Sequence, residues 1–145
     1  MRFRMRLRFL VIVLMTFLMS TGLMAQGTIQ LDKKGFLESV VNYEENANEW
    51  VYLGDRPSII DFYADWCRPC RIISPYLEEL AKEYGDEIYI YKIDVDKEQD
   101  LARAFGIQSI PTLLFVPQKE NPQIHSGMMS KEDLRTVIDE LLLKK

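Results

Sequence analysis

Two cysteines, separated by two residues, constrain this chain more than any other feature. Cys67 and Cys70 are the only cysteines in the 145 residues, so neither has another disulfide partner within the chain. An apolar, strand-like run over residues 58–64 precedes them, and residues 72–80 carry apolar side chains at helical spacing after them. The sequence therefore predicts that both sulfurs lie where a buried strand passes into a helix.

A helix N-terminus favours the thiolate form of a cysteine. The unpaired backbone N–H groups and the positive end of the helix dipole would stabilise an anion at Cys67. A thiolate attacks disulfides, and a thiol about one helical turn later can expel the group that has become bonded to it. We therefore predict thiol–disulfide exchange with Cys67 as the nucleophile and Cys70 as the resolving thiol.

Two other uses of the cysteine pair remain open from the residues alone. A zinc site usually needs about four Cys, His or carboxylate ligands, and the only histidine, His125, is far along the chain. An inert structural disulfide would gain little from closing so short a loop. Neither alternative explains the pair as well as redox chemistry does.

The N-terminal segment predicts export. Residues 1–8 carry four arginines and no acidic residue, residues 9–19 are almost continuously apolar, and small residues follow up to Ala25. This is the order of a signal peptide, and we expect residues 1–25 to be cleaved after Ala25. An uncleaved anchor is the alternative, because about 17 apolar residues can cross a bilayer. Both place the domain, residues 26–145, in the periplasm or otherwise outside the cytoplasm.

Charge and composition restrict the partners. A chain that is 48% hydrophobic and 28% charged is typical of one globular domain. Loss of the four N-terminal arginines would change the formal net charge from −4 to −8. So acidic a surface argues against nucleic acid as a partner. Two cysteines are also too few for a disulfide scaffold, which favours a protein that acts on the disulfides of others.

The remaining patterns alternate between strands and helices. We expect the helix from Cys70 to be interrupted at Pro75 and to end at Gly85. Residues 50–53 could form an additional short strand or a flap. The other elements are strands at 28–31, 88–95, 112–116 and 123–126, and helices after Asp32, over 99–105 and after Ser130. The order β-α-β-α-β-α-β-β-α predicts an α/β sheet with helices available for both faces.

Four motifs together resemble the thioredoxin family in order and spacing. They are residues 61–70 (DFYADWCRPC), 92–96, 105–112 and Gly127. With the signal sequence, the chain resembles the extracytoplasmic bacterial thioredoxins most. The resemblance implies the thioredoxin fold, with a central mixed β-sheet flanked by helices on both faces. It also implies a monomeric protein-disulfide reductase that uses no cofactor and no metal. Outside the cytoplasm, its redox partner would be a membrane electron relay or an oxidase.

Asp61 and Lys92 are the candidate proton-transfer residues. Asp61 interrupts an apolar strand, where a charge is costly unless it is paired or neutralised, although a solvated strand face would also explain it. The resemblance implies that Asp61 accepts the proton of Cys70, helped by Lys92. An exposed strand lysine is the alternative for Lys92.

The resemblance also defines a substrate groove. Pro111 would form a cis peptide bond facing the disulfide, and the backbone of Ile110 would pair with an extended substrate. From the residues alone, a trans turn proline is the ordinary expectation. Gly127 either lets the substrate approach closely or simply ends a strand. Trp66 is either a core aromatic or a lid, and the resemblance favours the lid. Pro69 and Arg68 complete the groove.

Arg68 departs from the family, which usually has glycine between the first cysteine and the proline. With Arg71, it places two cations beside the sulfurs, which favours the thiolate and makes the disulfide a better oxidant. We therefore expect a reduction potential above the roughly −270 mV of thioredoxin and well below about −120 mV. If Arg68 points into solvent, its effect is small.

Three other functions remain possible from the sequence. A disulfide isomerase or oxidase, or a thiol donor for cytochrome c maturation, would use the same cysteines in another setting. A non-catalytic module would instead use the groove beside Pro111 to hold partner segments.

Overall fold

The computed structural model describes residues 27–145, so the expected signal segment and its cleavage site lie outside the described residues. A five-stranded mixed sheet with the order β1-β3-β2-β4-β5 forms the centre of the domain. The strands are β1 (Ile29–Gln30), β2 (Ser58–Tyr63), β3 (Tyr89–Asp94), β4 (Thr112–Val116) and β5 (Gln123–Ser126). β3 is parallel to β1 and β2, whereas β4 is antiparallel to both β2 and β5.

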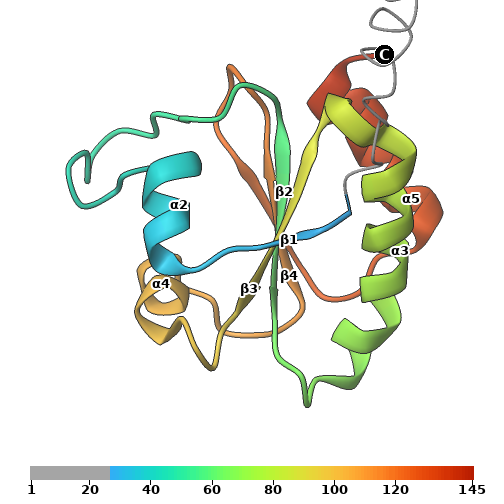
Figure 1. Ribbon diagram of the computed structural model, residues 1–145, viewed down its shortest axis with the longest axis horizontal. Helices are drawn as coiled ribbons and strands as arrows, with labels where there is room; N and C mark the ends of the chain where they lie inside the picture. Colours follow the sequence, from blue (N-terminus) through green and yellow to red (C-terminus); the bar gives the residue numbers. More distant parts are fainter. Residues whose placement is uncertain (1–26) are drawn as a thin grey trace, which may run out of the picture.

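Helices cover both faces of this sheet. Figure 1 shows α2 (Lys33–Ser39) and α4 (Gln99–Ala104) on one side of the strands, and α3 (Arg68–Tyr84) and α5 (Lys131–Val137) on the other. The element order and the two helical layers confirm the α/β fold with a mixed sheet that the sequence predicts.

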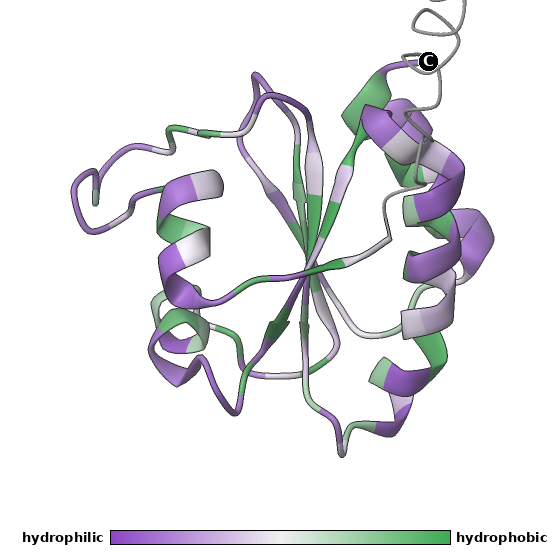
Figure 2. Ribbon diagram, viewed as in Figure 1, coloured by the Kyte–Doolittle hydropathy of each residue, from purple (hydrophilic) through white to green (hydrophobic). Residues whose placement is uncertain are grey.

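The alternation of side chains along β2 divides the core into two layers. Ile59 packs in the layer that contains Ile73 and Leu77 of α3. Ile60 and Phe62 point the other way, into the layer beneath α2 and α4. Figure 2 shows hydrophobic residues along the central strands, while the loop after α2 is mostly hydrophilic. Since successive strand residues face opposite sides, Asp61 must lie on the same face as Ile59, under α3.

The helix ends follow the residues that the sequence provides. Asp32 is the N-cap of α2 and accepts a hydrogen bond from the Gly35 N–H, and Ser130 caps α5 in the same way through the Asp133 N–H. α3 ends at Tyr84, and Gly85 follows with a φ of +49°, in the left-handed region that glycine tolerates best. A single 3-10 turn, η1 (Gly85–Glu87), then leads toward β3.

The structure contradicts one local expectation, the interruption at Pro75, and adds detail to two others. α3 continues through Pro75, because a proline inside a helix removes only one hydrogen bond and the rest of this helix is held by packing on the sheet. Of the two alternatives for residues 50–53, the strand does not form, and the Leu53 N–H donates a hydrogen bond to the Val40 carbonyl instead of to a sheet edge. The final helix does not remain an α-helix: after α5 it widens into the π-helical η2 (Ile138–Leu143).

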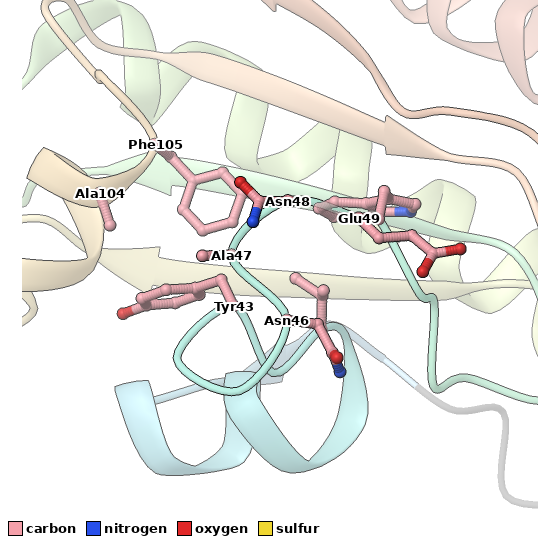
Figure 3. A pocket seen from close by; sticks show the side chains of 9 residues that line it. Tyr43, Asn46, Ala47, Asn48, Glu49, Ala104 and Phe105 are labelled. Carbon is pink, nitrogen blue, oxygen red and sulfur yellow. The ribbon is translucent and has the colours of Figure 1, made fainter.

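The loop after α2 lies over an aromatic cluster rather than over the cysteines. The ring of Phe105 packs edge-on against Phe36, Tyr43 and Trp50. A surface hollow of about 430 Å³ lies beside these rings, bordered by residues of the loop and of α4 (Figure 3). None of its lining residues is among the predicted site residues. Over residues 27–145, the structure contains no helix with the length and apolar character needed to span a membrane.

Candidate active site

Cys67 and Cys70 form a disulfide at the first turn of α3, with their Cα atoms 5.3 Å apart. Cys67 is the N-cap residue of this helix, and its Sγ accepts a hydrogen bond from the Cys70 N–H at 3.2 Å. The sulfurs pack with Ala64 and are nearly buried, at 4% exposure for Cys67 and 2% for Cys70. The backbone therefore already directs an N–H group at the sulfur on which a negative charge would form.

Pro69 and Arg68 build this turn. Arg68 is the first helical residue, and Pro69 follows in the first turn. Backbone N–H groups in the first turn have no partner within the helix, so the missing N–H of proline costs no helical hydrogen bond there. Arg68 and Arg71 are both exposed, and neither forms an ion pair with any residue of the described domain. Their cationic groups are thus in solvent beside the disulfide.

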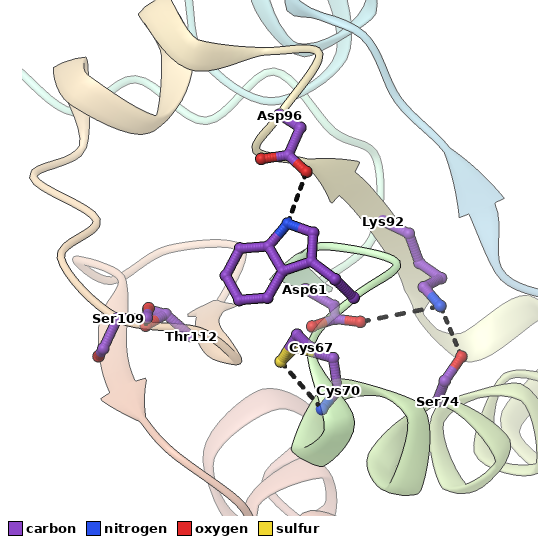
Figure 4. The surroundings of a disulfide bond; sticks show 9 residues. Asp61, Cys67, Cys70, Ser74, Lys92, Asp96, Ser109 and Thr112 are labelled. Atoms are coloured by element: carbon purple, nitrogen blue, oxygen red, sulfur yellow. Dashed lines mark hydrogen bonds and ion pairs between the residues drawn. A yellow bond between two sulfur atoms is a disulfide. The ribbon is translucent and has the colours of Figure 1, made fainter.

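Asp61 belongs to β2 and is fully buried, and Figure 4 shows it next to the cysteines. Neither carboxylate oxygen has a hydrogen-bond partner within residues 27–145. Burial raises the pKa of Asp61 to about 6, and the positive charge of Lys92 opposes this rise only in part. At neutral pH the carboxylate is therefore mostly ionised, yet it is a stronger base than a solvated aspartate.

Lys92 is the register partner of Asp61 on the neighbouring strand β3. Its Nζ lies 4.0 Å from Asp61 Oδ2 and donates a hydrogen bond of 2.5 Å to Ser74 Oγ on α3. The same ammonium lies 4.5 Å from the centroid of the Tyr63 ring. Figure 4 shows this group between the sheet and the helix, with Lys92 linked to both Asp61 and Ser74. Lys92 is only 8% exposed, so it is not an ordinary surface lysine of a strand.

Trp66 precedes the cysteines and is 68% exposed, which excludes a role as a core aromatic. Its indole Nε1 donates a hydrogen bond of 2.8 Å to Asp96 Oδ2, and Figure 4 shows the carboxylate of Asp96 bound to this ring. Asp96 follows β3 and donates its own N–H to Asp94 Oδ1. The ring is therefore held at the surface next to the disulfide.

The Ile110–Pro111 peptide bond is cis. Ile110 packs against the cluster that contains both sulfurs. The carbonyl of Pro111 accepts a hydrogen bond of 2.8 Å from the N–H of Gly127, which has a φ of +103°. The structure therefore places Ile110 against the disulfide cluster and joins Gly127 to the neighbouring Pro111.

Two residues of this site have no role in the sequence interpretation. Ser74 contacts Lys92, and Asp96 binds the indole of Trp66. Helical spacing could have identified Ser74, because it follows Cys70 by four residues and so lies on the same side of α3. Its partner on β3 depends on how the helix crosses the sheet. Within residues 27–145, no group of three or more His, Cys, Asp or Glu side chains is arranged to hold a metal ion.

A disulfide across Cys-x-x-Cys, at the N-terminus of a helix that packs on a mixed sheet, defines the class of thiol–disulfide oxidoreductases. A sequence model named Thioredoxin matches residues 38–140, and the chain belongs to the thioredoxin family. It is therefore an enzyme that acts on the disulfides of proteins.

Individual relatives agree with this assignment. The chain is 44% identical to a thioredoxin of Borreliella burgdorferi over 112 residues, which cover 77% of this chain and 95% of that protein. It is 44% identical to a thioredoxin of Bacillus subtilis over 84 residues, covering 58% of this chain and 81% of that one. Among solved structures, a mutant thioredoxin from Halobacterium salinarum superposes with a TM-score of 0.62 at 28% identity, covering 79% of this chain and 89% of that one.

Proposed function

We propose that the protein is an exported thioredoxin that reduces disulfides of other proteins outside the cytoplasm. The observation that carries the chemistry is the hydrogen bond from the Cys70 N–H to Cys67 Sγ, at the N-terminus of a helix of 17 residues. In the reduced protein, the same N–H and the helix dipole would stabilise a thiolate at Cys67. Cys67 is therefore the nucleophile.

The first step forms a mixed disulfide. The Cys67 thiolate attacks one sulfur of a substrate disulfide, a new S–S bond forms, and the second substrate sulfur leaves as a thiolate that takes up a proton. The exposed ring of Trp66 and the Ile110–Pro111 segment border the disulfide, so they would contact the substrate chain. An extended substrate could then pair with the backbone of Ile110.

The second step releases the substrate. Cys70 gives its proton to the Asp61 carboxylate, attacks Cys67 Sγ and expels the remaining substrate sulfur as a thiolate, which is then protonated. Two electrons pass to the substrate, and the protein is left with the Cys67–Cys70 disulfide. A carboxylate with a pKa of about 6 is suited to this transfer, because it is ionised at neutral pH and is more basic than an exposed aspartate.

We propose that the direction is reduction. The relatives named above are thioredoxins, and a potential above the roughly −270 mV of thioredoxin but well below about −120 mV still lets the reduced dithiol act as electron donor. The oxidised protein must then be reduced by another dithiol. For an exported protein, this is a membrane protein that carries electrons across the bilayer. The N-terminal arginines and the apolar run after them support export, and the protein would act as a monomer.

Trapping of substrates tests the proposal. In Cys70→Ala, Cys67 should stay bonded to substrates in mixed disulfides that dithiothreitol reduces. Mass spectrometry should then identify the trapped proteins as exported ones. Cys67→Ser should form no such adducts and should lose catalysis of insulin reduction by dithiothreitol. If Cys67→Ser still binds the same partners and the wild-type protein shows no turnover, the domain is a binding module. If the wild-type protein accumulates oxidised in cells, it is an oxidase instead. If it stays reduced and rearranges substrate disulfides without reducing them, it is an isomerase.

A further inference from the structure

Two oxygen acceptors lie near the ammonium of Lys92, the Asp61 carboxylate and the Ser74 hydroxyl, and the ammonium donates its hydrogen bond to the neutral hydroxyl. Ser74 Oγ accepts its hydrogen bond at 2.5 Å, whereas the nearest oxygen of Asp61 is 4.0 Å away, beyond hydrogen-bonding distance. Ser74 lies one helical turn after Cys70 and projects from α3 toward β3, as Figure 4 shows. A serine hydroxyl on the helix thus interacts with the charge that would otherwise pair with the carboxylate.

This arrangement is unusual for two buried groups of opposite charge. A hydrogen bond between an ammonium and a carboxylate is stronger than one between an ammonium and a hydroxyl. Asp61 nevertheless has no hydrogen-bond partner for either oxygen within the described domain. Something must therefore keep Lys92 away from it. The hydroxyl of Ser74 is the only side-chain group that hydrogen-bonds Lys92 Nζ in residues 27–145.

We propose that Ser74 is a positioning residue: it holds the Lys92 ammonium short of the Asp61 carboxylate and so preserves Asp61 as a base for Cys70. The part concerning Cys70 rests on the proposed function, whereas the part concerning Lys92 and Asp61 does not. Ser74 need not touch the reacting sulfurs, because it acts through Lys92.

Within the described residues, no charged group other than Lys92 faces the Asp61 carboxylate. On β4, the register partner of Asp61 is the apolar Leu113, and α5 contributes the buried Leu134 to this layer. On β3, Asp94 lies two residues beyond Lys92 and is engaged by Lys97, whose Nζ is 2.9 Å from Asp94 Oδ2. The polar groups that α3 contributes to this site are Ser74, which is uncharged, and Cys70, which is in the disulfide. Burial therefore has the larger effect on the basicity of Asp61, and Lys92 is the charge in the described residues that opposes it.

Removal of the hydroxyl should let the ion pair close. In Ser74→Ala, the Lys92 ammonium loses its acceptor and can move onto Asp61 Oδ2. Because an opposite charge in contact with a carboxylate favours the ionised form, we expect the pKa of Asp61 to fall by about 1 unit or more. Ser74→Thr keeps the hydroxyl and should leave the pKa within about 0.3 units of the wild-type value.

The decisive measurement is a titration of the Asp61 side-chain carbon by NMR in the full-length, disulfide-bonded protein. It compares wild type, Ser74→Ala and Ser74→Thr with Lys92→Met and the double variant Ser74→Ala/Lys92→Met. If Ser74 acts through Lys92, its removal should change the pKa only when Lys92 is present. An unchanged pKa in Ser74→Ala, an equal shift in Ser74→Thr, or an equal shift without Lys92 would each overturn the proposal.

A second readout separates this inference from the proposed function. In the reduced protein, the rate at which Cys70 resolves a mixed disulfide at Cys67 should depend on the ionisation of Asp61, and Ser74→Ala should move the acid limb of that pH profile to lower pH. If the NMR shift occurs and the pH profile does not move, Ser74 still positions Lys92, but Asp61 is not the base for Cys70.

Discussion

Asp61 and Lys92 occupy paired positions on adjacent parallel strands, and 4.0 Å separates the ammonium nitrogen from the nearest carboxylate oxygen. Both side chains are buried under α3, where each charge loses its hydration. The distance is too long for the hydrogen bond that would compensate the carboxylate. The pair therefore does not stabilise the fold. It maintains a basic group below the cysteines at the expense of stability.

Asp61→Asn should make the folded state more stable at neutral pH. The pKa of Asp61 rises from 3.8 to about 6 on folding, so the folded state binds the proton more tightly than the unfolded state does. Below about pH 4, Asp61 is protonated in the folded state, so burial of its charge costs no stability. The free energy of unfolding declines as the pH rises toward 6, and above that it is lower by about 3 kcal/mol. Urea unfolding at pH 8 should show a gain of about 2 to 3 kcal/mol, and at pH 4 almost none.

The exposed Asp65 provides the matched control for this measurement. Asp65→Asn alters a carboxylate in the same motif without removing a buried charge, so its effect should stay within about 0.5 kcal/mol at both pH values. A gain in Asp61→Asn that is the same at pH 4 and pH 8 would mean that the charge is not its cause.

Gly127→Ala should destabilise the domain and weaken substrate binding. The φ of +103° is a conformation that L-residues rarely adopt, and a Cβ at this position would meet no atom within 4 Å. The cost is therefore one of backbone conformation, about 1 to 2 kcal/mol in urea unfolding. Gly106, which also has a positive φ of +61°, is the control outside the groove. Gly106→Ala should cost similar stability and leave the KM for insulin unchanged, whereas Gly127→Ala should raise it.

Arg68→Gly should lower the reduction potential. The cation at the start of α3 favours the Cys67 thiolate and hence the reduced state. Because Arg68 is exposed, its contribution is below 1 kcal/mol, and 30 mV corresponds to about 1.4 kcal/mol. Equilibration with glutathione should therefore show a decrease of roughly 10 to 20 mV, smaller at high salt.

Two further variants isolate the charge in that experiment. Arg68→Gln keeps a long polar side chain and should reproduce most of the decrease. Arg103→Gln removes an arginine of α4 that is paired with Asp100, and it should leave the potential unchanged. A wild-type potential at or below that of thioredoxin would contradict the expected influence of Arg68.

Local sequence signals predict the elements because they act over a few residues. Asp32 and Ser130 carry side-chain oxygens that reach the backbone N–H three residues later, so they mark helix starts regardless of the rest of the fold. Pro75 shows the limit of this reasoning. Its local preference is to break a helix, but packing of α3 on the sheet outweighs one missing hydrogen bond.

The site was predictable where a motif joins residues that are close in sequence, and not where the fold brings them together. Cys67 and Cys70 follow from their spacing alone. The contact of Ser74 with Lys92 requires the crossing of α3 over β3, and the bond from Trp66 to Asp96 requires two loops to meet at the end of the sheet. Such contacts depend on the exact direction in which each side chain leaves its helix or loop, and the periodicity of apolar residues in the sequence does not specify that direction.

Glu78→Gln should weaken the attachment of the first strand to the domain. Glu78 Oε2 accepts hydrogen bonds from the Thr28 N–H at 3.0 Å and from the Thr28 hydroxyl at 2.7 Å, and these bonds lower the pKa of Glu78 to about 2. β1 has only two residues, so this carboxylate on α3 is a main tether for the start of the domain.

A folded-state pKa of Glu78 below the unfolded one means that the stabilisation is complete above about pH 4.5 and is lost as pH falls through about 2. Because the side chain is 39% exposed, solvent screens the charge, and the loss at pH 7 should be about 1 kcal/mol or less. Hydrogen exchange at the Thr28 amide should accelerate in Glu78→Gln and not in Glu79→Gln, whose carboxylate binds Lys131 instead. Equal exchange at Thr28 in both variants would show that β1 is held by its pairing with β3 and not by Glu78.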